Sequence, residues 1–154
     1  MLTFILVFAV LSLITFLLSL FHVPSQHVVV IEWSVWIPGA LRPADPDHVI
    51  ARPGEQGTEA RHYMPGWNFR LFVRVFTKFY QFPFVIIPDD QVVVVTAADG
   101  EEKPAGEVFG VWLDPECLTD GERFLRDGGQ RGPQAWVIGP GGTCAFNQLL
   151  FRHE

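Results

Sequence analysis

The chain has 154 residues, and its 11 basic and 17 acidic side chains give a net charge of −6. A nucleic-acid partner demands a basic surface, so this balance argues against nucleic-acid binding. Two cysteines, Cys117 and Cys144, are too few for a disulfide framework and lack the spacing of metal-binding pairs. We therefore expect no metal and no cofactor.

The N-terminus is the most apolar part of the chain. The run from Leu2 to Phe21 holds no charged residue, Glu32 is the first charge and Arg42 the first basic residue. A helix needs about 20 apolar residues to cross a hydrocarbon core of roughly 30 Å. The run therefore predicts a single-pass transmembrane anchor over residues 1–22 and a membrane location, with the side of the soluble part left undetermined.

Two other interpretations of this run are a cleaved signal peptide and a buried core helix. A cleaved signal peptide needs a basic start and a small-residue cleavage site, and neither is present. A buried core helix is usually shorter and carries one polar face. Ser12, Thr15 and Ser19 share one helix face, which suits close packing of membrane helices but is also tolerated without any such role.

The remainder reads mostly as strands. Runs rich in β-branched and aromatic residues lie at 27–31, 69–87 and 91–97, and Asp99-Gly100 is a hairpin turn signal. Twelve prolines and fourteen glycines interrupt these runs. One short helix is expected near 119–127, where Thr119 and Glu122 form a capping box. The predicted fold class is a mostly β (α+β) domain behind the transmembrane helix.

An internal repeat divides the predicted β part in two. Val23-Pro24 followed by Gln26 to Val30 matches Ile87-Pro88 followed by Asp90 to Val94, at an offset of 64. The glycine-rich segments at 54–66 and 129–141 match at an offset of 75, which implies an 11-residue insertion in the second copy. We expect two β lobes at 23–87 and 88–154.

The two copies differ in charge. Residues 22–87 hold six basic and five acidic residues, a net charge of +1. Residues 88–154 hold five basic and twelve acidic residues, a net charge of −7. The first copy is thus the one that tolerates an anionic lipid surface.

Several of these motifs together resemble one superfamily. The most specific is Phe-Leu-Arg-Asp-Gly-Gly-Gln-Arg-Gly-Pro-Gln at 124–134. It is accompanied by Pro-Ser-Gln-His-Val-Val-Val at 24–30 and by the segment 140–147. They are similar to the N-terminal part of SPFH proteins, the Band 7 or prohibitin-homology superfamily of stomatins, prohibitins, flotillins and Hfl-type protease regulators. The likeness is greatest to bacterial flotillin-like members. Pro115 to Thr119 and Cys144 to Asn147 depart from the family pattern.

The resemblance implies an SPFH-type domain with a non-catalytic role. Such a protein would be a membrane-anchored scaffold or interaction module that organises lipids or partner membrane proteins. Membrane lipids, other SPFH subunits or membrane proteins are the implied partners. A first alternative is an accessory regulator of a membrane protease or transporter.

A basic and aromatic stretch is the candidate membrane contact. Read as a strand, 70–84 places alternate residues on one face, and these are Arg70, Phe72, Arg74, Phe76, Lys78 and Tyr80. Cations with aromatic rings suit a bilayer interface. The same pattern also suits an outer face whose aromatics pack under a loop while the Arg and Lys stems snorkel.

Two further groups of residues were considered for chemistry. Gly128, Gly129, Gln130, Arg131 and Gly132 lack the spacing of a phosphate-binding loop, so we expect these glycines to serve backbone geometry. Cys144 with His62 or His48 offers a thiol and a base but no orienting third group. A thiol-dependent enzyme is therefore the second alternative function, and a non-enzyme is expected.

Overall fold

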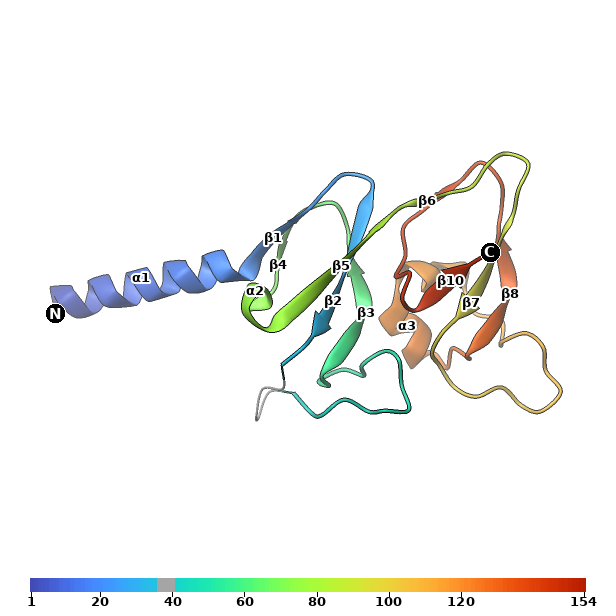
Figure 1. Cartoon of the computed structure of the whole chain (residues 1–154), viewed down its shortest axis with the longest axis horizontal. Helices are drawn as coiled ribbons and strands as arrows, with labels where there is room; N and C mark the ends of the chain where they lie inside the picture. The colour runs from blue at the N-terminus through green and yellow to red at the C-terminus, as the bar shows by residue number, and fades with distance from the viewer. Residues whose placement is uncertain (36–40) are drawn as a thin grey trace.

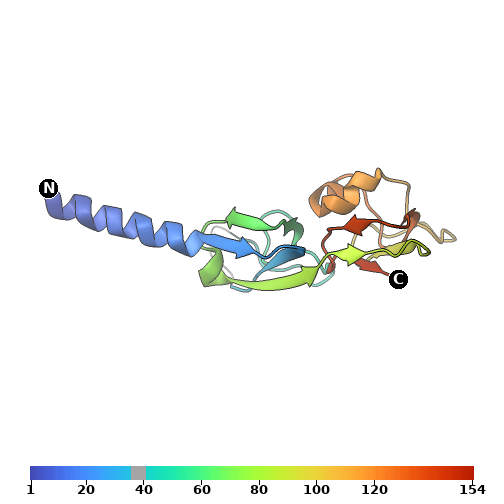
Figure 2. The same ribbon diagram turned by 90° about the horizontal axis from the view of Figure 1, so that it is seen from above.

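The computed structural model describes residues 1–35 and 41–154. A long helix at the N-terminus leads into two β lobes that follow one another along the molecule (Figures 1 and 2). The elements in chain order are α1 (Leu2–Ser19), β1 (Leu20–Val23), β2 (His27–Trp33), β3 (Gly57–Tyr63), β4 (Gly66–Phe69), α2 (Val73–Phe76), β5 (Thr77–Pro83), β6 (Val85–Ile86), β7 (Val93–Ala97), the 3-10 helix η1 (Pro115–Thr119), α3 (Gly121–Arg126), β8 (Gly132–Ile138), β9 (Thr143–Cys144) and β10 (Phe151–His153).

The N-terminal apolar run is shared between a helix and a strand. Helix α1 ends at Ser19 after 18 residues, and Leu20 and Phe21 belong to β1, which pairs with β4. Within residues 1–35 and 41–154 there is no helix with the length and apolar character needed to cross a bilayer. The predicted single-pass anchor over residues 1–22, and with it the location as a single-pass membrane protein, is therefore wrong.

The predicted fold class, a mostly β domain behind a transmembrane helix, is wrong for the same reason. The chain is a small α+β fold, and among the described residues its N-terminal helix is not long and apolar enough to cross a membrane. The predicted continuous strand over 69–87 is also wrong, because β4, α2, β5 and β6 divide that segment. Phe72 adopts a left-handed conformation, with φ of 53°, and this turn breaks the extended backbone before α2 begins.

The first lobe contains two small antiparallel sheets. One has the strand order β3-β2-β5, and the other pairs β1 with β4. Strand β2 is the central strand, and four consecutive residues of it, 28–31, are buried, as expected for a strand covered on both faces. The core of this lobe consists of Phe21, Val23, Val29, Ile31, Tyr63 and Val73.

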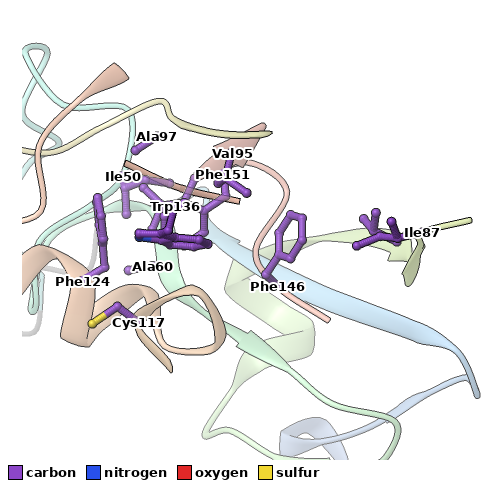
Figure 3. Close-up of a cluster of buried hydrophobic side chains, with 12 residues drawn as sticks. Ile50, Ala60, Ile87, Val95, Ala97, Cys117, Phe124, Trp136, Phe146 and Phe151 are labelled. Carbon is purple, nitrogen blue, oxygen red and sulfur yellow. The ribbon is translucent and has the colours of Figure 1, made fainter. Parts of the chain in front are cut away.

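The second lobe has a larger core around the sheet β10-β7-β8. Phe124 of α3 packs edge-on against Phe151 of β10, with ring centroids 5.0 Å apart, and Trp136 of β8 lies in the same cluster (Figure 3). Ile50 and Ala60 of the first lobe also belong to this core. The two lobes are therefore joined by shared apolar burial as well as by chain connection.

The two three-stranded sheets have the same construction. In the first, Val30 pairs with His62 and Glu32 with Thr58, with an irregularity between Val30 and Glu32. In the second, Val94 pairs with Val137 and Thr96 with Pro133, with an irregularity between Val94 and Thr96. Corresponding residues of the central strands are 64 positions apart, and those of their partners 75. The register thus follows the two offsets seen in the sequence repeat.

The two lobes differ most in the connection that joins the central strand to its repeated partner strand. The β7–β8 connection is longer than the β2–β3 connection and contains η1 and α3. Asp120 caps α3, because its Oδ1 accepts a hydrogen bond from the Arg123 N–H at 3.0 Å. The Thr119 hydroxyl instead donates to the Glu116 carbonyl, so the predicted Thr119 capping box is wrong by one residue.

Two buried polar side chains fasten the lobes to each other. Asp99 is fully buried, and its carboxylate accepts hydrogen bonds from the N–H groups of Ile50 and Gly100 at 2.7 Å each, with His48 Nδ1 at 3.0 Å. Asn147 is also fully buried, and its amide donates to the carbonyls of Glu59 and Ala60. Both side chains belong to the second lobe and bind backbone of the first.

We predict that the stability of the fold depends on pH through Asp99. Burial alone would raise the pKa of this carboxyl group, but the N–H groups of Ile50 and Gly100 and the His48 ring together hold it below its ordinary value. A lowered folded pKa means that the stabilisation is present above about pH 4 and is lost as the pH falls through the folded pKa.

Asp99→Asn should lower the free energy of unfolding by about 1–3 kcal/mol at neutral pH, because the amide cannot accept from both backbone N–H groups. It should also flatten the loss of stability in acid. Thermal unfolding at a series of pH values measures both effects, with Asp90→Asn, an exposed carboxylate, as the control. Equal acid sensitivity in Asp99→Asn and the wild type would contradict this account.

Candidate functional site

The junction between α1 and the first lobe is held by Ser19. Its hydroxyl is fully buried, donates to the Thr15 carbonyl at 2.7 Å and accepts from the Phe72 N–H at 3.0 Å. The Ser19 carbonyl accepts from the Arg70 N–H at 2.8 Å. These bonds attach the loop between β4 and α2 to the last turn of the helix, which ends where Leu20 adopts an extended backbone.

Helix α1 presents apolar side chains on all its sides. It extends away from the lobes, with the N-terminus at its far end (Figures 1 and 2). Among its large apolar residues, Phe4 is 82% exposed and the others are also open to the surroundings. These residues are Phe4, Ile5, Leu6, Val7, Phe8, Val10, Leu11, Leu13, Ile14, Phe16 and Leu17, which we call the apolar arm. A helix that is apolar all round is normally buried against something.

The apolar surface continues onto the lobe where the arm is attached. Trp67 is 74% exposed and Phe69 is 56% exposed, and the Phe69 ring lies 6.0 Å from that of Phe16. Trp67 also packs edge-on against His22. We call the exposed set at this end the apolar base, and it consists of Trp67, Phe69, Leu71, Phe72 and Val75.

The predicted basic and aromatic face is divided by this geometry. Phe72 precedes α2 and Phe76 ends it, and their rings pack against each other with centroids 6.2 Å apart. Arg74 lies on α2 between them and is exposed. Arg74 makes no ion pair within residues 1–35 and 41–154, so its charge is available to the surroundings.

Arg70 is bound to side chains of the sheet, although it remains exposed. Its guanidinium contacts Glu59 Oε1 at 2.7 Å and lies 5.8 Å from the centre of the Trp33 ring. Glu59 also accepts hydrogen bonds from Trp33 Nε1 and the Tyr63 hydroxyl. Burial alone would lower the pKa of Arg70, but Glu59 raises it above its ordinary value. Arg70 is therefore engaged in an internal network.

Lys78 and Tyr80 are likewise engaged, both with Glu32. The Tyr80 hydroxyl donates to Glu32 Oε2 at 2.5 Å, and Lys78 Nζ lies 3.7 Å from Glu32 Oε1. The hydrogen bond to this carboxylate raises the pKa of Tyr80. Of the six predicted contact residues, Phe72 belongs to the apolar base and Arg74 lies beside it, and both are exposed. Their contact with lipid stays a prediction.

The glycine-rich motif lies between α3 and β8. Gly128 and Gly132 have φ of 81° and 107°, a region that favours glycine. A Cβ on Gly129 would lie 2.5 Å from the Phe124 ring. The Gln130 side chain accepts from the Val111 N–H, and Arg131 donates to the Asp47 carbonyl. All five residues therefore have internal geometric roles here, and the absence of a ligand stays a prediction.

A cavity of about 620 Å³ brings together two residues that were considered for catalysis. His62 and Cys144 both line it, with Trp136, Ile138 and Phe146 supplying apolar walls. Burial lowers the pKa of His62 and raises the pKa of the Cys144 thiol. Both shifts favour the neutral groups, the opposite of a thiolate–imidazolium pair. His48 is elsewhere, against Asp99.

The apolar base includes residues that the sequence did not single out. Trp67 and Phe69 lie outside the alternation over 70–84, and that alternation places Leu71 on the face opposite Arg70. The αL turn at Phe72 breaks that alternation and leaves Leu71 exposed. A cluster of aromatic residues on both sides of Gly66 was the available signal.

Comparisons of this chain with family models, with curated proteins and with solved structures find no match.

We predict that Gly129 is needed because of its contact with Phe124. Gly129→Ala should lower the free energy of unfolding by about 1–3 kcal/mol, because the new methyl group overpacks against a buried ring. Gly139→Ala is the matched control, since a Cβ there has no neighbour within 4 Å. Thermal unfolding compares the two. Equal melting temperatures for both variants, or a rise in the wild-type melting temperature with added phosphate or nucleotide, would contradict a purely structural role.

Proposed function

We propose that this protein is a non-catalytic, SPFH-like interaction module that associates with membrane lipids through the apolar arm and the apolar base. The observation that carries the proposal is the continuous exposed apolar surface formed by α1 and by the residues around Ser19. The proposal concerns contact with lipid and does not require that α1 crosses a bilayer.

The size and composition of this surface support a lipid partner. Exposed apolar patches beyond a few hundred Å² are rare on soluble monomers and mark sites of association. Trp67 and the Phe residues of the apolar base lie at the end of the arm, and aromatic rings favour the boundary between hydrocarbon and headgroups. The apolar base would thus lie at the headgroup level.

The distribution of charge supports the same orientation. Arg74 is exposed within the apolar base, and the first lobe carries a net charge of +1, whereas the second carries −7. A cation close to an anionic lipid surface contributes about 1 kcal/mol. The more acidic lobe lies at the other end of the molecule, away from the arm (Figure 1).

A vesicle flotation experiment tests this function. Full-length protein, exchanged from mild detergent into phosphatidylcholine vesicles, should float with the lipid. Phe69→Ser combined with Leu71→Ser should shift a clear fraction to the unbound layer, because two apolar contacts at the boundary are lost. Ile86→Ser is the matched control, because Ile86 is as exposed but lies in β6.

Anionic lipid separates the charge contribution from the apolar one. With added phosphatidylserine at low salt, Arg74→Glu should weaken binding several-fold, and high salt should remove the difference from the wild type. A wild-type protein that stays out of the lipid layer as a discrete soluble particle would contradict the proposal.

A further inference from the structure

A second exposed apolar surface lies at the opposite end of the molecule. The connection between β7 and η1 forms the tip furthest from the N-terminus in both views (Figures 1 and 2). Val108 and Trp112 in this connection are 68% and 64% exposed, and Phe109 and Val111 are also open. We call these four residues the tip cluster. Four large apolar side chains within five positions form a patch that the fold itself does not bury.

The backbone of the tip cluster is held in place by hydrogen bonds. Lys103 Nζ donates to the Val108 carbonyl at 2.6 Å, the Gly110 N–H to the Pro133 carbonyl at 2.8 Å, and the Val111 N–H to Gln130 Oε1 at 2.9 Å. Gly110 sits so close to the Gln134 amide that an added Cβ would lie 3.1 Å from its oxygen. A loop ordered in advance loses less entropy when a partner binds.

The charge around the tip cluster is acidic. Glu102 and Glu107, in the same connection as the tip cluster, are exposed and form no ion pair within the part of the chain that the structure describes. Lys103 is the one cation of this connection, and it keeps its charge while it donates to the Val108 carbonyl, so residues 98–114 still hold five acidic side chains against one basic side chain. An anionic rim is repelled by an anionic lipid surface, and it attracts a partner with basic flanks.

We propose that the tip cluster is a docking surface for a protein segment in which apolar side chains are flanked by Lys or Arg. Trp and Phe are the residue types that dominate binding energy at protein interfaces, and Trp112 and Phe109 would fill this role. The acidic rim sets the charge of the partner. This surface goes beyond the lipid contact, because it lies at the other end of the molecule and shares no residue with the apolar arm or base.

Selection from a displayed library of random short peptides tests the proposal, with the full chain held in neutral lipid or mild detergent. The selected peptides should combine apolar residues with Lys or Arg. Phe109→Ser combined with Trp112→Ser should weaken their binding by about ten-fold or more, as loss of two aromatic contacts does. Glu102→Lys with Glu107→Lys should weaken it several-fold at low salt and less at high salt.

Ile86→Ser serves as the matched control, because it removes an exposed apolar residue far from the tip. Unchanged melting temperatures of the variants would show that they remain folded. The proposal is overturned if no peptide is enriched, if the selected peptides are acidic, or if they bind Phe109→Ser/Trp112→Ser as tightly as the wild type. Loss of vesicle binding in that double variant would instead make the tip a lipid contact. The peptide-binding test of the tip and the vesicle-binding test of the arm are independent, because their double variants share no residue.

Discussion

The hydroxyl of Ser19 is the contact on which the arrangement of this molecule depends. It lies in the last turn of α1 and accepts a hydrogen bond from the N–H of Phe72, and it thereby ties the loop before α2 to the helix. Without that junction, the chain from 2 to 21 reads as one uninterrupted apolar helix. With it, the last residues of the run join the β1–β4 sheet, and the arm adjoins the exposed side chains of the apolar base. This buried polar side chain, the β1–β4 pairing and the turn at Phe72 together fix the arm to its base.

The duplicated construction of the lobes explains why the molecule has two different ends. Each lobe contains a three-stranded antiparallel sheet with the same register irregularity in its central strand. In the first lobe, the additional structure is α1, which precedes the repeat. In the second lobe, it is the long connection after β7, which supplies the tip cluster, η1 and α3. Asp99 and Asn147 then fix the two lobes to each other through hydrogen bonds to backbone. The proposed lipid contact and the proposed docking surface thus lie on elements outside the repeated core.

Sequence reasoning succeeded where one local signal determines the structure. The β-branched runs at 27–31 and 91–97 lie in or overlap β2 and β7, and a short helix occurs near 119–127. It failed where a tertiary contact overrides the local pattern. The length of the apolar run from 2 to 21 predicts a spanning helix, but its last two residues pair with β4 as part of β1, and the helix is shorter as a result. Alternation over 70–84 predicts one basic face, but the turn at Phe72 interrupts it, and the carboxylates of Glu59 and Glu32 engage three of its six residues in ion pairs or hydrogen bonds. Neither a left-handed residue nor a distant carboxylate partner can be read from spacing.

The central claim is that lipid covers the arm and its base but not the tip. Site-directed spin labelling tests it most directly, with Cys117→Ala and Cys144→Ser as the cysteine-free background and single cysteines in place of Leu11, Phe69 and Phe109. Accessibility to a water-soluble paramagnetic reagent is compared between detergent-free protein and protein in vesicles. The account predicts that vesicles shield the labels at 11 and 69 and leave the label at 109 accessible. Labels at 11 and 69 that remain as accessible in vesicles as at 109, or that are shielded equally without lipid, would contradict it.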